Sequence, residues 1–146
     1  MKYDDVSWHS GGKDFPKDLP QEAAATHIGM FVAWMVLNDL IGDEFQADWA
    51  EEIQMLKMRK ISPGQFVWQY MDGKFSSIDL SEKGRMFADA YYQSEVGDNY
   101  LKAYGVAIKG DLSTEYLLPD TWQTYAKVSV LIDIAYQSWL EAQRSR

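Results

Sequence analysis

The sequence predicts an all-α fold, built as a single compact domain of about five to six helices. Apolar residues recur at intervals of three and four along several segments, which is the spacing of one helix face. No stretch of useful length alternates apolar and polar residues as a half-buried strand does. The 146 residues suit one domain over 1–146, and 47% hydrophobic residues with 14% aromatics are enough for a substantial core.

The elements are expected in a simple order. An irregular but ordered N-terminal arm covers 1–18, and helices follow at about 19–41, 44–59, 63–71, 80–94, 98–104 and 120–143. Five of these segments start where Asp or Ser precedes Gln or Glu by three residues, the capping-box spacing: Asp18–Gln21, Asp43–Gln46, Ser62–Gln65, Asp79–Glu82 and Asp120–Gln123. Asp72-Gly73 predicts a turn, and the KFSSI after it predicts a brief extended piece.

Three of the expected helices show how they are buried. The first contains IGMFVAWMVL, which is apolar on all sides and predicts the central helix, and Gly29 within it indicates a close contact with a neighbouring element. The inward face of the second helix is predicted to hold Phe45, Trp49, Ile53 and Leu56. The last helix has its clean face at Trp122, Tyr125, Ser129, Ile132, Tyr136 and Trp139.

Composition excludes several classes of protein. The net charge of −8 makes a nucleic-acid partner unexpected, because such proteins need a basic surface. The longest apolar run, Ile28 to Leu37, is about half the roughly 18 residues that span a bilayer, so no membrane association is expected. The chain has no cysteine, and its start has no apolar segment of a secretory signal, so we expect a cytoplasmic protein.

The negative charge is concentrated in one part of the chain. From Asp18 through Leu56 there are eight acids and no Lys or Arg. The densest part holds six of them: Asp39, Asp43, Glu44, Asp48, Glu51 and Glu52. These six are either the solvated face of a helix or a surface that receives a basic protein partner. We take them as the candidate partner-binding residues.

Both histidines lie in the stretch WHSGGKDFPKDLPQEAAATHIGMF, residues 8–31. A metal-dependent enzyme centred on His9 and His27 would draw further ligands from Asp4, Asp5, Asp14 or Glu22. The histidines are 18 residues apart and lack a spacing such as H-E-x-x-H, which argues against a metal site.

The alternative is a structural role for the same stretch. His27 shares a helix stripe with Ala23, Phe31 and Trp34, and Trp8 and Phe15 would tether the arm across it. No catalytic motif is present, so we predict no catalytic residue, no metal and no cofactor, and a binding protein in place of an enzyme.

Several strings resemble the signature of an uncharacterised bacterial domain-of-unknown-function family. They are YDD-x-x-WH, FP-x-x-LP-x-E and ATHIGMF-x-AW near the start, with DLSEKGRMFADAYY, YLKAY and LPDTWQTYAKVSVLID later. The resemblance covers nearly the whole chain and carries no known catalytic residue. Its likeness to small acidic proteins associated with bacterial toxins implies an immunity role.

Two functional hypotheses follow beside the metal-dependent enzyme. The first is an immunity protein that neutralises a cognate bacterial toxin by direct binding, in which the acidic segment meets a basic toxin surface. The second is a helical scaffold or adaptor module that uses its many aromatic residues at an interface.

Overall fold

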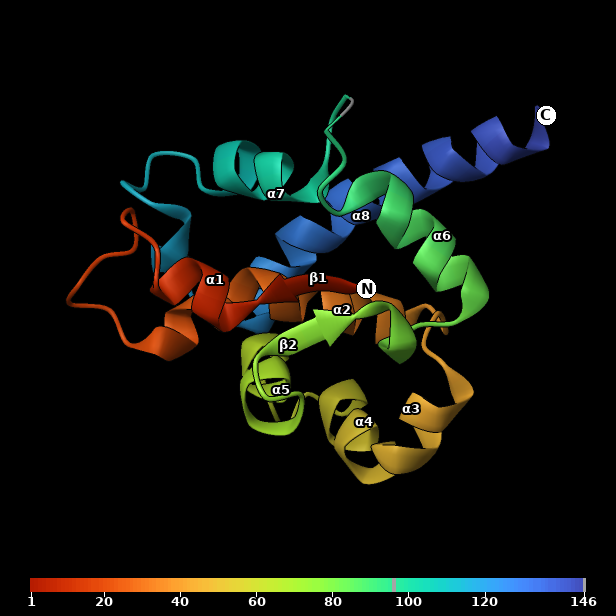
Figure 1. The fold of residues 1–146 in the computed structure, drawn as a ribbon, viewed down its shortest axis with the longest axis horizontal. Coiled ribbons are helices and arrows are strands. Elements are labelled where there is room, and N and C mark those ends of the chain that lie inside the picture. Colours follow the sequence, from red (N-terminus) through yellow and green to blue (C-terminus); the bar gives the residue numbers. More distant parts are fainter. Residues whose placement is uncertain (96, 146) are drawn as a thin grey trace.

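The computed structural model describes residues 1–95 and 97–145, and these residues form a mainly helical fold with eight α-helices and one two-stranded sheet (Figure 1). Its elements are β1 (Lys2–Asp5), α1 (Val6–Ser10), η1 (Gln21–Ala25), α2 (Thr26–Leu37), α3 (Asp43–Asp48), α4 (Ala50–Lys57), α5 (Pro63–Tyr70), β2 (Lys74–Ser76), η2 (Ser77–Asp79), α6 (Glu82–Tyr91), α7 (Tyr100–Ala103), η3 (Tyr104–Ile108), η4 (Glu115–Leu117) and α8 (Trp122–Arg144). The π-helix is η3, whereas η1, η2 and η4 are 3₁₀-helices. The predicted helical class is confirmed, but the helices are more numerous and shorter than expected.

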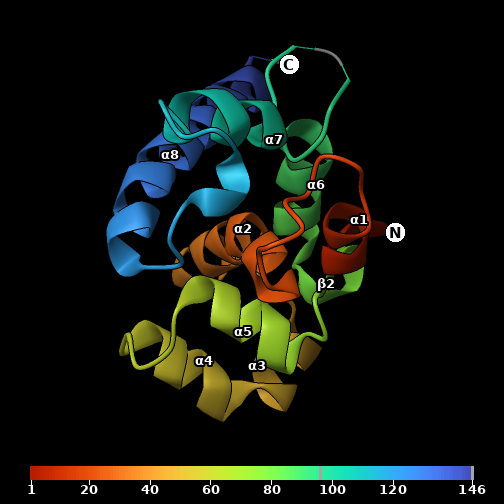
Figure 2. The same ribbon diagram turned by 90° about the vertical axis from the view of Figure 1, so that its left-hand side faces the viewer.

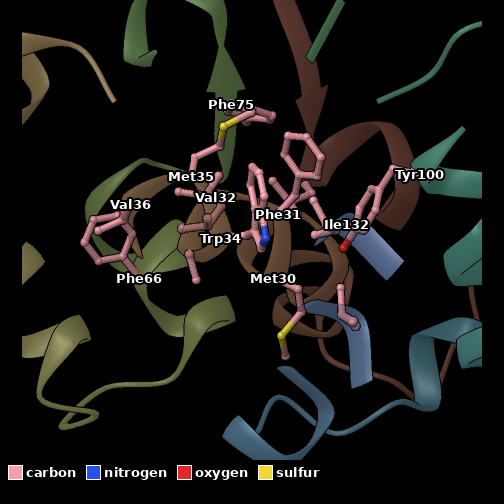
Figure 3. Packing of buried hydrophobic residues seen from close by; sticks show 14 of the residues in the cluster. Met30, Phe31, Val32, Trp34, Met35, Val36, Phe66, Phe75, Tyr100 and Ile132 are labelled. Carbon is pink, nitrogen blue, oxygen red and sulfur yellow. The ribbon is translucent and has the colours of Figure 1, made fainter. Parts of the chain in front are cut away.

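The centre of the molecule is α2, as the sequence predicts. Eleven of its twelve residues are buried, and it packs against α5, α4 and α8 (Figure 2). Phe31 and Trp34 from this helix meet Tyr100 and Ile132 from the C-terminal half in one hydrophobic cluster (Figure 3). Apolar burial of this kind is the main favourable contribution to folding, at about 25 cal/mol per Å².

The predicted N-terminal arm is ordered but not irregular, so that part of the prediction is wrong for residues 2–10. β1 pairs antiparallel with β2, with Asp4 opposite Phe75 and Asp5 opposite Lys74. The register shifts between Lys2 and Asp4. A bulge of this kind re-aims side chains. It explains why consecutive residues, Tyr3 and Asp4, are both buried at 1% exposure.

Only one of the five predicted capping boxes is present. Ser62 caps α5 and Gln65 completes the box, whereas Gly42, Ser81 and Thr121 occupy the N-cap positions expected for Asp43, Asp79 and Asp120. Pro20 likewise precedes η1 where Asp18 was expected. Asp120 instead joins the cap of α5: its Oδ1 accepts from the Gly64 N–H at 2.7 Å and its Oδ2 from the Gln65 N–H at 3.1 Å. A long-range contact therefore replaces the local one.

Two predicted helices are interrupted. The first is 3₁₀ over η1 and its α-helical part ends at Leu37, before the Gly42 that was expected to stop it. The second breaks at Trp49, whose backbone leaves the helical region with φ −118° and ψ 27°, so α3 and α4 are separate helices. Phe45, Ile53 and Leu56 are buried as predicted and Trp49 is half-buried, because the break preserves the inward face.

The last helix, α8, is less buried than its apolar face predicts. Tyr125 and Ile132 are buried, whereas Trp122, Tyr136 and Trp139 are half-buried against the core. The C-terminal end of this helix projects beyond the body of the molecule (Figure 1). Although α8 has 23 residues, no helix in the described ranges is both long and apolar enough to cross a membrane.

The predicted close contact at Gly29 is confirmed and gives the first testable prediction. A Cβ atom at this position would lie 2.2 Å from the Pro63 carbonyl oxygen at the start of α5. We expect Gly29→Ala to lower the free energy of unfolding by about 1–3 kcal/mol, because α2 and α5 must separate. Urea denaturation measures this difference.

Gly105→Ala is the matched control, because a Cβ there has no heavy atom within 4 Å. We expect this control to be neutral or to gain up to about 1 kcal/mol from the higher helix propensity of Ala. Equal unfolding midpoints for the two variants would contradict the close packing of α2 on α5.

Candidate functional site

Both histidines and one aspartate meet at the N-terminal end of α2. The His9 Nε2 atom lies 2.6 Å from Asp4 Oδ1, and the His27 Nε2 atom lies 3.1 Å from Asp4 Oδ2. The two Nε2 atoms are 3.2 Å apart, and the imidazole rings meet edge to face with centroids 4.4 Å apart. Two nitrogens and a carboxylate therefore converge at one point.

Three different elements bring these side chains together. The bulge in β1 turns Asp4 inward, and α1 begins immediately after the strand and carries His9 on its single turn. Asp5 fixes the start of α1, because its Oδ1 accepts from the Ser7 N–H at 2.9 Å. His27 is the second residue of α2.

The Asp4 carboxylate is buried and fully engaged. Besides the two imidazoles, its Oδ1 accepts from the Asp5 N–H at 2.8 Å and its Oδ2 from the Tyr92 hydroxyl at 2.6 Å. Burial by itself would raise the pKa of Asp4, but the hydrogen bonds and charges of His27 and His9 outweigh it and hold that pKa well below its ordinary range. The carboxylate is ionised at neutral pH and acts only as an acceptor.

The ionised Asp4 carboxylate determines which imidazole nitrogens carry a hydrogen in the metal-free cluster. Each Nε2 atom must carry the hydrogen that it shares with Asp4, because an ionised carboxylate donates none. Burial lowers the pKa of His27, against the opposing effect of Asp4, so this imidazole is neutral at pH 7. The remaining nitrogen of His9, Nδ1, lies 2.8 Å from the Tyr116 hydroxyl, which can donate to it or accept from it.

A pocket of about 200 Å³ opens beside the histidines. Its lining residues are His9, His27, Leu101, Tyr104, Glu115 and Tyr116. Tyr104 is the first residue of the π-helix η3 and is only 2% exposed, and its hydroxyl has no hydrogen-bond partner among the described residues. A buried polar group without a partner is unfavourable, so this hydroxyl needs a hydrogen-bond partner that the described residues do not supply.

A larger groove of about 750 Å³ lies elsewhere, between α7–η3 and α8. Its walls are mostly apolar, with exposed Val106 and Ile134 on opposite sides. It brings together no group of side chains of the kind found at Asp4, so the smaller pocket is the chemically organised one.

The structure selects one of the acids that the sequence offered to the histidines. Asp4 alone joins them, whereas Asp5 caps α1 and pairs with the Lys2 ammonium at 2.8 Å. Asp14 and Glu22 are exposed. Phe15 packs on Tyr116 of η4, whereas the prediction placed it across α2. Trp8, expected to tether the arm as well, is 52% exposed, with the Lys2 ammonium 5.4 Å from the centre of its ring.

The six acidic residues predicted to face solvent do lie at the surface of the molecule. Five of them, Asp39, Asp43, Glu44, Asp48 and Glu51, are exposed, and Glu52 is half-exposed. Within residues 1–95 and 97–145 no ion pair neutralises any of these six carboxylates. They lie on α3, α4 and the turn before α3, away from the cluster at Asp4.

In the structure the two histidines meet in spite of their separation in the sequence. A separation of 18 residues between two histidines excludes a motif on one helix, but not a site assembled from a strand and two helices. The signal in the sequence was the string YDDVSWH, in which Asp4 and His9 are close enough for one strand-to-helix turn to join them. No pattern in the amino-acid sequence predicts the bulge in β1 that turns Asp4 inward.

Comparison with known families gives one match. The family described as a domain of unknown function, DUF7832, matches residues 2–118. The chain belongs to this family. No curated protein and no solved structure matches it. The matched range contains Asp4, His9, His27 and the whole lining of the pocket, and it ends before α8. The expected membership of an uncharacterised family is confirmed, whereas the likeness to immunity proteins stays a prediction.

The lowered pKa of His27 predicts a pH-dependent stability in metal-free protein. As the pH falls below about 6.5, the unfolded chain gains a proton on this residue that the folded chain does not. The free energy of unfolding should therefore decrease by up to about 1.4 kcal/mol per pH unit from this residue. Asp4, whose pKa is lowered, adds a further loss below about pH 4.

Urea denaturation at a series of pH values, in the presence of a chelator, measures this dependence. His27→Gln should remove the loss that begins near pH 6.5 and keep the one near pH 4. If the wild type and this variant lose stability in parallel between those two values, His27 is not held neutral by the fold.

Proposed function

We propose that this chain binds one divalent transition-metal ion at Asp4, His9 and His27. The observation that carries the proposal is the convergence of two Nε2 atoms and a carboxylate, all within 4.8 Å of one another. Two imidazoles with one carboxylate are a common ligand set for Zn²⁺ and for Fe²⁺ in proteins.

The spacing of the atoms supports this role. Ligands about 2.0–2.1 Å from a tetrahedral ion lie about 3.3 Å from each other. The two Nε2 atoms are 3.2 Å apart, and His27 Nε2 is 3.1 Å from Asp4 Oδ2. The shorter 2.6 Å contact between His9 Nε2 and Asp4 Oδ1 is a direct hydrogen bond, which the ion would replace.

The positions of the imidazole hydrogens also support the proposed metal site. A metal ion needs the lone pair of each Nε2, so both His9 and His27 must carry their hydrogen on Nδ1 when the ion is bound. For His9 the structure shows the partner of that nitrogen. The Tyr116 hydroxyl, 2.8 Å from Nδ1, accepts that hydrogen as readily as it donates to the bare nitrogen. Tyr92 and the Asp5 N–H keep the carboxylate oriented through the change.

Charge and hardness narrow the choice of ion. The six residues around the pocket include no Lys or Arg, while the Asp4 and Glu115 carboxylates bring two negative charges to the site. The chain has no cysteine, so no thiolate can select Cu⁺. A divalent ion of borderline character, Zn²⁺ or Fe²⁺, fits this set.

Titration of chelator-treated protein with Zn²⁺ tests the proposal by calorimetry. We expect one ion per chain, and a gain of about 2.7 kcal/mol in the free energy of unfolding when free Zn²⁺ is 100 times its Kd. His9→Gln should weaken binding by at least about 100-fold, because even the partners behind metal ligands contribute 10–100-fold. His9 is suitable because its partly exposed side chain is the least buried of the three.

Asp14→Asn is the control, since it removes an exposed carboxylate from the same arm without touching the cluster. Circular dichroism verifies that both variants are folded. Equal Zn²⁺ affinities for the wild type, His9→Gln and Asp14→Asn would show that the ion binds elsewhere and would remove the proposal.

A second candidate function rests on the acidic surface, Asp39, Asp43, Glu44, Asp48, Glu51 and Glu52. Here the chain is an immunity protein that neutralises a bacterial toxin by binding a basic surface of it. The supporting observation is that these carboxylates face solvent with no ion pair in the described part of the chain. Such a field speeds association over distances of about 8 Å at physiological salt.

The product of the neighbouring gene is the partner to use in the test. If it binds, reversing Asp48, Glu51 and Glu52 to Lys should slow association and weaken its dependence on salt, with the melting temperature nearly unchanged. Association rates that are identical in the reversed and the wild-type protein at every salt concentration would reduce this surface to a solvated helix face.

A further inference from the structure

We infer that the metal ion proposed at Asp4, His9 and His27 has an open coordination position, and that this position faces the pocket formed by Tyr104 and Glu115. The inference rests on the proposed function. It assigns to the pocket a small, exchangeable oxygen ligand that accepts a hydrogen bond from Tyr104 and donates one to Glu115. Water is such a ligand, and so is a small hydroxamic acid.

The first step is the number of protein ligands. Within the described ranges, the group of ligand atoms that lie within 4.8 Å of one another contains Asp4, His9 and His27 and does not include Glu115. Three protein ligands are the usual complement of a catalytic zinc ion, which keeps its fourth position for water or substrate. A structural ion, in contrast, has four.

The second step is the direction of the open position. Tyr92 donates to Asp4 Oδ2, and Tyr100 donates to the backbone carbonyl oxygen of His27 at 2.5 Å. Both tyrosines are almost completely buried. His9 and His27, in contrast, both line the pocket, whereas neither tyrosine does. Access to the ion is therefore from the pocket.

The third step is Tyr104, the one observation that points to a ligand independently of the metal. Its ring packs against His27 with centroids 5.8 Å apart, the residue lines the same pocket, and its buried hydroxyl has no partner among the described residues. A tyrosine hydroxyl carries its hydrogen at neutral pH and can donate it to a ligand. A π-helical turn presents it, and such turns are frequent at functional sites.

Glu115 supplies the complementary acceptor. It is the first residue of η4, half-buried, and it lines the pocket beside Tyr116. A ligand bound between Tyr104 and Glu115 thus meets one donor and one acceptor in a space of about 200 Å³. That volume is below the roughly 300 Å³ of common small-molecule sites, so the ligand is small or enters by one end group.

The experiment uses the full chain saturated with Co²⁺, whose visible absorption reports changes in its ligands. Acetohydroxamate is the probe: its oxygens replace the metal-bound water, which leaves to solvent, while its N–H group can donate to Glu115. We expect a saturable change in the spectrum. Tyr104→Phe should lower the affinity for acetohydroxamate by about tenfold, which is the effect of losing one hydrogen bond to a charged ligand. Tyr125→Phe, in α8 and outside the pocket, is the matched control and should leave the probe's affinity unchanged.

The outcomes separate the two claims. A chain that binds no Co²⁺ contradicts the metal site itself and, with it, this inference. A chain that binds Co²⁺ with a spectrum insensitive to acetohydroxamate retains the metal site but has a closed coordination shell, which overturns the open position. Equal acetohydroxamate affinity in the wild type and Tyr104→Phe, both saturated with Co²⁺, places the open position away from this pocket.

Discussion

The buried carboxylate of Asp4 is the constraint on which the rest of the structure depends. An ionised group in a protein interior is unfavourable by several kcal/mol unless hydrogen bonds and opposite charge compensate it. Four donors do so here: the Asp5 N–H, the Tyr92 hydroxyl and the two imidazoles. They come from β1, the end of α6, α1 and α2, so satisfying one side chain fixes the relative position of four parts of the chain.

The surrounding aromatic residues extend this arrangement into the core. Tyr92 and Tyr100 place their hydroxyls on polar atoms of the cluster, and both rings pack on Phe31 of the central helix. Tyr116 and Tyr104 face the same histidines from the C-terminal half. Tyr92 and Tyr100 therefore contact both the polar cluster and the hydrophobic core. The pocket lies beside the histidines, and its lining includes Tyr104, whose hydroxyl has no partner in the described ranges.

The sequence predicts the features that depend on local patterns. The buried character of α2, the contact at Gly29, the box at Ser62 and the exposure of the acidic residues all follow from neighbours within a turn or two. Features that depend on partners distant in the sequence are not predicted by local patterns. Asp120 caps α5 in place of its own helix, and Trp49 interrupts a helix that its pattern continues. The site belongs to this second kind, because a bulge in β1 and the pairing with β2 turn Asp4 toward His27.

The central claim is that Asp4, His9 and His27 act together as the ligands of one ion. X-ray absorption at the zinc edge of the Zn²⁺-loaded protein tests it most directly, because it identifies the ligand atoms themselves. The account predicts two imidazole nitrogens and one or two oxygens at about 2.0–2.1 Å, with the outer-shell scattering of two imidazole rings. A spectrum with a shell of oxygens alone and no imidazole scattering would contradict it.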